Sequence, residues 1–125
     1  MFENTKAFSG FSVDDVPRAE QFYGEMLGVK VSRQDEMLTL HIAGDRDILV
    51  YPKPNHEPAT FTILNFPVDD IEAAVDALTE RGVEFERYEG TELETDEKGI
   101  FRGGGPLIAW FKDPAGNVLS VLETS

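Results

Sequence analysis

The alternation of hydrophobic and polar positions predicts four strands and one helix in the first half of the chain. The strands are expected over residues 6–13, 29–33, 37–42 and 47–51. Between the first two, apolar residues recur at helical spacing: Val16, Ala19, Phe22, Tyr23, Met26 and Leu27. The Asp14-Asp15 pair directly before this stripe predicts a helix cap, and Gly28 predicts the end of the helix.

The second half of the chain shows the same succession of patterns. Strands are expected over four ranges: 61–68, 83–88, 107–112 and 118–122. A helical stripe follows Asp69-Asp70 and ends at Gly82; it contains Ile71, Ala74, Val75 and Leu78. The acidic stretch 89–99 is expected to be a solvated loop, with a lid over a cleft as the alternative.

Two short motifs occur once in each half, which predicts an internal repeat. Val13-Asp14-Asp15-Val16 returns as Val68-Asp69-Asp70-Ile71, and the segment 28–33 (GVKVSR) returns as 82–87 (GVEFER). Three prolines between the halves predict a linker over 52–59.

The repeat predicts a single α+β domain, 1–125, built of two βαβββ modules. The modules are expected over 7–51 and 60–123. Each module has one helix to cover one face of its four strands, so the opposite faces are expected to curve around a cleft.

Composition narrows the classes of partner and compartment. The chain has no cysteine, which excludes disulfides, zinc–thiolate sites and cysteine nucleophiles. With 24 acidic against 11 basic residues and a net charge of −13, nucleic acid is not an expected partner. There is no apolar run long enough for a membrane span and no visible signal peptide, so a cytoplasmic protein without membrane association is expected.

The order and repetition of these motifs resemble the vicinal oxygen chelate superfamily, which includes glyoxalase I, extradiol dioxygenases, fosfomycin-resistance enzymes and bleomycin-binding proteins. The matching pieces are Val13-Asp14-Asp15, Phe22-Tyr23 with Leu27-Gly28, Val68-Asp69-Asp70 and Asp113-Pro114-Ala115-Gly116-Asn117. The resemblance implies the glyoxalase/bleomycin resistance-like fold, a curved mixed sheet around a cleft. It also implies a homodimer. Whether the modules pair within one chain or across a dimer stays open.

Metal-using members of this superfamily are similar in four ligand positions, usually His or Glu, one on each of four strands that line the cleft. Aligned on the motifs, these positions fall on Phe8, Val50, Ile63 and Ser120. None of the four is an imidazole or a carboxylate, the ligand types that such a site needs. We therefore predict no metal and no other cofactor, and a cleft with apolar and aromatic walls.

Five further residues are candidates for the cleft. Trp110 is expected to form an aromatic wall, with packing in the core as the alternative. Tyr51 and Asn65 could orient a ligand through hydrogen bonds, and Arg102 could anchor an anionic group. His41 lies on the polar side of its strand and could serve in acid–base chemistry.

The residues and the resemblance together predict a metal-independent protein that binds a small molecule. The expected ligand is an apolar or aromatic metabolite or an antibiotic. The alternative is an enzyme of the lyase, isomerase or dioxygenase-like kind that uses His41, Tyr51 or Arg102 without a metal. A third interpretation is a regulatory or oligomer-forming module whose cleft is filled by its own side chains.

Overall fold

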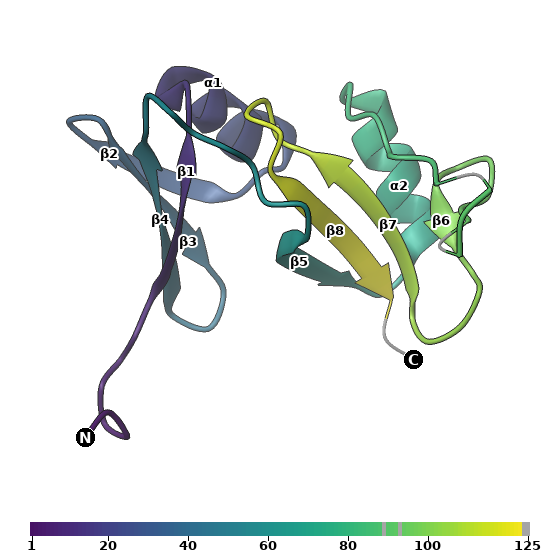
Figure 1. The fold of residues 1–125 in the computed structure, drawn as a ribbon, viewed down its shortest axis with the longest axis horizontal. Coiled ribbons are helices and arrows are strands. Elements are labelled where there is room, and N and C mark those ends of the chain that lie inside the picture. The colour runs from purple at the N-terminus through teal and green to yellow at the C-terminus, as the bar shows by residue number, and fades with distance from the viewer. Residues whose placement is uncertain (89, 93, 124–125) are drawn as a thin grey trace. The chain divides into compact units, whose positions relative to one another are not determined.

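The computed structural model describes residues 1–88, 90–92 and 94–123. The chain forms two compact units, residues 1–57 and 58–125, each with its own sheet and helix (Figure 1). The boundary between them falls inside the proline-rich stretch.

The first unit is a four-stranded mixed sheet with one helical segment. Its strands are β1 (Ser9–Val13), β2 (Lys30–Gln34), β3 (Met37–Ile42) and β4 (Arg46–Pro52). They lie in the order β1-β4-β3-β2, with β1 parallel to β4 and the other pairs antiparallel. Helix α1 (Val16–Gln21) continues into a π-helical segment, η1 (Phe22–Met26).

One face of this sheet packs under the helix. Leu38 on β3 lies directly opposite Val50 on β4, and the side chains of both are fully buried. Tyr23 of η1 is also fully buried, and its ring contacts that of Phe11 on β1, with the ring centroids 5.9 Å apart. Because side chains alternate along a strand, Thr39 and His41 emerge on the opposite face, as the sequence pattern predicts.

The second unit repeats this arrangement. Its strands are β5 (Thr62–Val68), β6 (Ile100–Phe101), β7 (Leu107–Lys112) and β8 (Val118–Glu123), and its helix is α2 (Ile71–Glu80). The strand order β5-β8-β7-β6, with β5 parallel to β8, matches that of the first unit. The predicted α+β fold of two repeated modules is confirmed.

The predicted strand 83–88 is wrong. In this range only Phe85 forms a β-bridge, to Phe111 of β7. The remaining edge of β7 is taken by the two-residue strand β6, which the sequence pattern did not predict. The outer position of this sheet is therefore divided between two short segments. The edge strand of the first unit, β2, is continuous.

The predicted helix caps are confirmed in both units. The carboxylate of Asp15 accepts a hydrogen bond from the backbone N–H of Arg18, and that of Asp70 accepts one from Ala73. Each cap satisfies a backbone donor that has no partner inside its helix. Gly28 follows the first helical segment with a φ of 71°, a conformation that glycine adopts without steric cost.

The 113–117 turn is closed by a single aspartate. Both Ala115 and Asn117 donate backbone N–H groups to Asp113 Oδ1, and the Asn117 side chain donates to Oδ2. Asp113 and Asn117 are both buried, so the turn is a fixed connection between β7 and β8.

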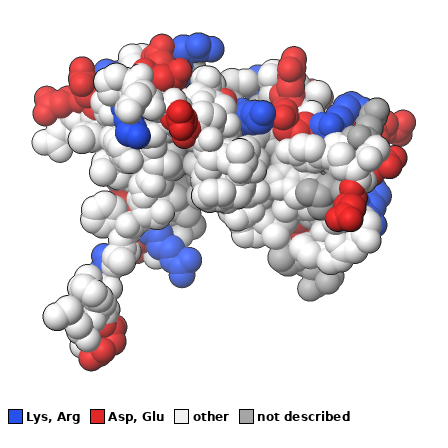
Figure 2. Space-filling model, viewed as in Figure 1, with Lys and Arg blue, Asp and Glu red and all other residues white. Residues whose placement is uncertain are grey.

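Charged groups are unevenly distributed on the surface. In the face that Figure 2 shows, acidic side chains form several separate clusters, and large parts of the surface carry no charged side chain. In the part of the chain that the structure describes, no helix has the length and apolar character needed to cross a membrane.

Candidate functional site

Three aromatic side chains gather on the second unit, around Trp110 of β7. The ring of Tyr88 lies 5.4 Å from that of Trp110, between centroids, in an edge-on arrangement. The ring of Phe101, on β6, lies 6.1 Å from Trp110 at a tilt of 45°. All three residues are half-buried, so part of each side chain faces solvent. We call Tyr88, Phe101 and Trp110 the Trp110 patch.

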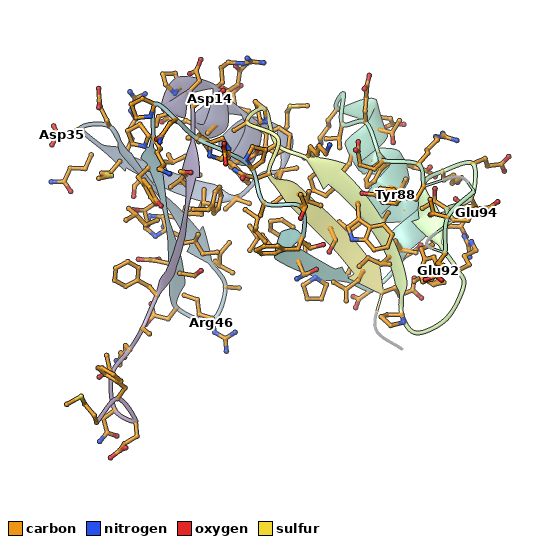
Figure 3. All side chains as sticks on the ribbon, viewed as in Figure 1. Asp14, Asp35, Arg46, Tyr88, Glu92 and Glu94 are labelled. Atoms are coloured by element: carbon orange, nitrogen blue, oxygen red, sulfur yellow. The ribbon has the colours of Figure 1, made fainter. Side chains whose placement is uncertain are left out.

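The patch lies on the sheet face away from α2. Ala109 and Phe111, the neighbours of Trp110 along β7, are fully buried, as is Leu119 on β8. These residues belong to the face that α2 covers, since α2 contacts β7 and β8. Side chains alternate between the two faces of a strand, which places Trp110 on the uncovered face. Tyr88 appears beside β7 in Figure 3.

Polar groups on the neighbouring strands fix the orientation of the patch. Trp110 donates its indole N–H to Thr62 Oγ1 at 3.1 Å. Ser120 lies directly opposite Trp110 in the β7–β8 ladder, and its Oγ donates to Asn65 Oδ1 at 2.5 Å. Among the described residues the Asn65 side-chain nitrogen has no hydrogen-bond partner, and Asn65 is exposed. It can therefore donate a hydrogen bond to a bound molecule.

The segment that carries Tyr88 is tied to β7 by two interactions of Glu86. Its backbone N–H donates to the carbonyl of Trp110 at 2.7 Å, and its carboxylate forms an ion pair with Lys112 at 3.3 Å. Burial raises the pKa of Tyr88, the Glu86 carboxylate raises it further, and Lys112 opposes them. At neutral pH the Tyr88 hydroxyl is therefore protonated and can act as a donor.

The structure brings three of the sequence-predicted site residues together: Trp110, Asn65 and Ser120. Ile63 lies two residues before Asn65 on β5 and is half-buried, at the irregularity where the pairing of β5 with β8 shifts. Ser120 is fully buried, so it supports Asn65 instead of contacting a ligand itself.

Arg102 is not presented to the Trp110 patch. Its Nε donates to Asp96 Oδ2 at 2.9 Å, and its Nη2 lies 3.7 Å from a carboxylate oxygen of Glu72 on α2. The hydrogen bond to Asp96 raises the pKa of Arg102, and the charges of Asp96 and Glu72 add to that effect. Two carboxylates of the protein thus pair with the Arg102 guanidinium, which the sequence had suggested as an anchor for an anionic ligand.

The structure corrects the prediction that Val50 lines the cleft. Its side chain is fully buried against Leu38 on the helix-covered face, so it does not line an open surface. The neighbours Leu49 and Tyr51 emerge on the other face, where Tyr51 lies beside Ser12 in the β1–β4 ladder. Because the residues on both faces of β4 are apolar, the sequence pattern does not show which of them face the helix.

The other two predicted residues of the first unit lie on accessible surface. Phe8 directly precedes β1 and is 72% exposed. His41 is hydrogen-bonded through both ring nitrogens, to Ser32 and to Asp47.

The four positions that the resemblance assigns to metal ligands do not fit a divalent cation. Phe8, Val50 and Ile63 have no donor atom in their side chains, and the Ser120 hydroxyl is committed to Asn65. Within residues 1–88, 90–92 and 94–123, no group of three or more His, Asp or Glu side chains is arranged to hold a metal.

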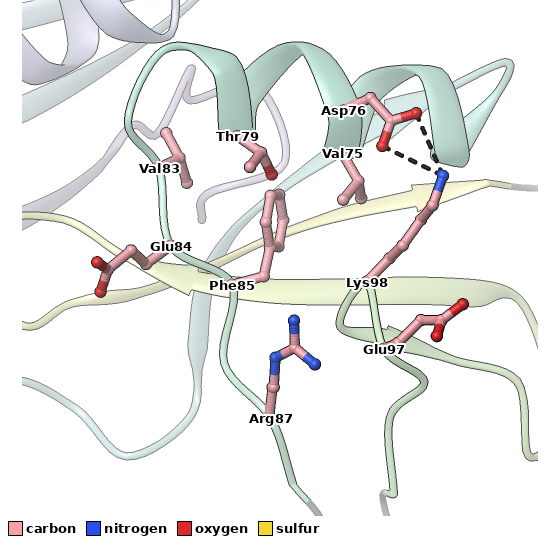
Figure 4. A pocket seen from close by; sticks show the side chains of 9 residues that line it. All are labelled: Val75, Asp76, Thr79, Val83, Glu84, Phe85, Arg87, Glu97 and Lys98. Carbon is pink, nitrogen blue, oxygen red and sulfur yellow. Dashed lines mark hydrogen bonds and ion pairs between the residues drawn. The ribbon is translucent and has the colours of Figure 1, made fainter.

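A separate cavity of about 450 Å³ lies between α2 and the segments 83–87 and 97–98 (Figure 4). Val75, Val83 and Phe85 form its apolar part, Thr79 adds a hydroxyl group, and Arg87 extends toward it. Its remaining border is charged: Asp76, Glu84, Glu97 and Lys98. Lys98 forms an ion pair with Asp76 at 3.2 Å.

Sequence reasoning missed Tyr88 and Phe101. A signal for Tyr88 was present, because it alternates with Val83 and Phe85 and so belongs on the opposite face of an extended segment. No comparable signal marked Phe101, since a two-residue strand is too short to show a period.

Comparison with known proteins identifies the family. The model of the Glyoxalase/Bleomycin resistance protein/Dioxygenase superfamily matches residues 8–121. The chain therefore belongs to this superfamily, and the resemblance seen in the motifs is confirmed. A search of curated proteins finds no match.

Solved structures share the fold at low sequence identity. TnmS3, an antibiotic-binding protein from Streptomyces sp. CB03234, is 24% identical, with a TM-score of 0.68 and 98% of each chain covered. A glyoxalase family protein from Enterococcus faecalis is 23% identical, with a TM-score of 0.71, covering 98% of this chain and 100% of that one. The fosfomycin resistance protein FosX from Mesorhizobium loti is 13% identical, with a TM-score of 0.67, covering 100% of this chain and 95% of that one.

Proposed function

We propose that this protein binds a flat, apolar or aromatic small molecule on the Trp110 patch, without a metal ion. The observation that carries the proposal is the convergence of three half-buried rings from separate segments. The side-chain amide of Asn65 lies two strands from Trp110 in the same sheet and can donate a hydrogen bond. Ring faces supply contact area, and the few polar groups fix the orientation of the ligand, as in small-molecule sites generally.

The hydrogen bonds around the patch favour a site that is formed before the ligand arrives. Thr62 holds the Trp110 indole, and Ser120 holds Asn65, so these side chains lose little freedom on binding. The net charge of −13 favours a neutral or cationic ligand over an anion. The antibiotic-binding TnmS3, which has the same fold, supports an antibiotic as one member of this ligand class.

The proposal includes two further expectations: a homodimer, which the resemblance implies, and a cytoplasmic location, which rests on the sequence lacking a visible signal peptide. Sedimentation equilibrium of the purified chain tests the first. A mass close to the 13.9 kDa of one chain across the micromolar range would contradict it.

The proposed site can be tested with the neutral fluorescent probe N-phenyl-1-naphthylamine. Trp110 is the only tryptophan, so energy transfer from tryptophan to the bound probe reports binding close to this residue. We expect saturable transfer that persists in excess EDTA. Phe101→Ala should raise the Kd about tenfold, because one aromatic contact contributes up to about 1.5 kcal/mol.

Two further variants serve as controls. Phe2→Ala removes an aromatic side chain that is 75% exposed and distant in sequence, and we expect an unchanged Kd. Tyr88→Phe keeps the ring and should retain most of the affinity. Equal weakening by Phe2→Ala and Phe101→Ala, or binding that requires an added divalent cation, would contradict the proposal.

A further inference from the structure

A serine, a histidine and an aspartate lie in line on the first unit, far in sequence from the Trp110 patch. His41 Nε2 lies 2.8 Å from Ser32 Oγ, and His41 Nδ1 lies 3.0 Å from Asp47 Oδ1. The serine and the carboxylate therefore use opposite nitrogens of one imidazole. This is the connectivity in which a histidine activates a serine hydroxyl.

The strand register explains how three residues from three strands meet. His41 on β3 lies directly opposite Asp47 on β4 and Lys30 on β2, and Ser32 is two residues along β2 from Lys30. Residues opposite each other in an antiparallel pair share a face, as do residues two apart along a strand. All four side chains therefore emerge on the face that α1 does not cover.

The charge of Asp47 determines the tautomer of the neutral histidine. A carboxylate can only accept a hydrogen bond, so Nδ1 carries the proton and donates it to Asp47. The Nε2 lone pair then faces the Ser32 hydroxyl and can accept its proton. Ser32 and Asp47 are exposed and the His41 side chain is 34% exposed, so an ester can reach the hydroxyl from solvent.

We infer that Ser32, His41 and Asp47 form a hydrolytic site for small activated esters, an activity separate from binding at the Trp110 patch. Isolated exposed ion pairs contribute little to the stability of a fold. Stabilisation is therefore a weak explanation for this arrangement of three side chains. Ser32 is the nucleophile, His41 is the general base and acid, and Asp47 is a positioning residue.

The reaction balances with water as the only co-reactant. Ser32 Oγ attacks the acyl carbon while its proton moves to His41 Nε2, and the alcohol leaves after taking that proton. Water then attacks the acyl–Ser32 ester and gives a proton to His41, which returns it to Ser32 as the carboxylic acid departs. Lys30, which lies opposite His41 in the ladder and shares this face with Ser32, would supply a cation to stabilise the developing oxyanion.

The site is tested with p-nitrophenyl acetate and with a fluorophosphonate that labels activated serines. We expect release of p-nitrophenolate and a covalent label on the peptide that contains Ser32. Ser32→Ala should abolish the label and lower the rate at least about a hundredfold, the lower end of what general-base assistance contributes. Asp47→Asn should lower the rate to a similar extent, and Asp47→Glu should restore part of it.

Ser12→Ala is the matched control, because Ser12 also contacts a histidine, His56, but through Nδ1. We expect its rate and the labelling of Ser32 to be unchanged. Circular dichroism verifies the fold of each variant. An unlabelled Ser32, or a rate that Ser32→Ala leaves unchanged because His41 attacks the ester itself, would overturn the inference.

Discussion

At the scale of single residues, Asp96 shows how a partly exposed carboxylate organises the loop before β6. Its Oδ1 accepts backbone N–H groups from Lys98 and Ile100, each at 2.9 Å, and its Oδ2 accepts from Arg102. Burial alone would raise the pKa of Asp96, but the hydrogen bonds from Arg102 and the two backbone groups outweigh it. The pKa of Asp96 is consequently below its ordinary value of 3.8.

Asp96→Asn should therefore destabilise the protein in a pH-dependent way. A carboxylate whose pKa is lower in the folded state stabilises that state above pH 3.8, and the contribution is lost as pH falls through the folded-state value. At pH 7 we expect a loss of about 1.5–3 kcal/mol in the free energy of unfolding, typical of hydrogen bonds to a charged group. Urea denaturation at pH 7 and pH 2.5 measures the difference, which should narrow at the lower pH.

Glu92→Gln is the control for this experiment. Glu92 is exposed in the same acidic stretch, and no hydrogen bond or ion pair engages its side chain among the described residues. We expect it to leave the free energy of unfolding unchanged at both pH values. A destabilisation by Asp96→Asn that is equally large at both values would show that the lost contact is not the ionised one.

The sequence predicts the role of a residue correctly where a single local interaction determines that role. Asp15 and Asp70 were recognised as caps because an aspartate directly before a helical stripe has a backbone donor within reach. Val50 was placed wrongly because Ile48 and Val50 on one face of β4 are as apolar as Leu49 and Tyr51 on the other. Only the position of the helix distinguishes the two faces.

At the scale of elements, the outer edge of β7 is built from two segments that meet at Gly99. Phe85 bridges to Phe111 near the end of β7, and Ile100 pairs with Ala109 nearer its start. Gly99 has a φ of +89°, and a Cβ at this position would lie 2.8 Å from the Cβ of Phe85. Glycine is thus needed both for the backbone conformation and for the close approach of the two segments.

Gly99→Ala should destabilise the second unit more than Gly90→Ala does. Gly90 also has a positive φ, +74°, but no atom of the residues that the structure describes lies within 4 Å of its would-be Cβ. Both variants carry the conformational cost of about 1–2 kcal/mol, and only Gly99→Ala adds the contact with Phe85. Thermal unfolding of the two variants compares them, and an equal loss of Tm would contradict the close approach.

The outer edge of β7 also shows where a pattern of apolar and polar residues fails to predict a strand. Every second residue from Val83 to Arg87 points to the same side, a pattern compatible with a strand. Only Phe85 forms a bridge to β7, however, because β6 pairs with the rest of that edge. Strands β3 and β7 were predicted with their observed bounds, because β3 alternates between apolar and polar residues and β7 is an apolar run between turn-forming residues. Edge pairing depends on contacts distant in sequence.

At the scale of the whole molecule, most of the architecture was predicted from the internal repeat. The recurring Val-Asp-Asp motif and the glycine after each helix predicted two similar units, and their strand orders match. The candidate site was predicted less completely. Trp110 and Asn65 were named from the sequence, but the rings that complete the patch come from β6 and from an irregular segment.

The central claim is that an apolar aromatic molecule binds at Trp110 without a metal. The most direct test is the indole N–H resonance of ¹⁵N-labelled, EDTA-treated protein during a titration with N-phenyl-1-naphthylamine. Trp110 is the only tryptophan, so the spectrum contains one such peak. We predict that this peak shifts progressively and saturates with the probe. A peak that stays in place while the probe binds, or that moves only after a divalent cation is added, would contradict the account.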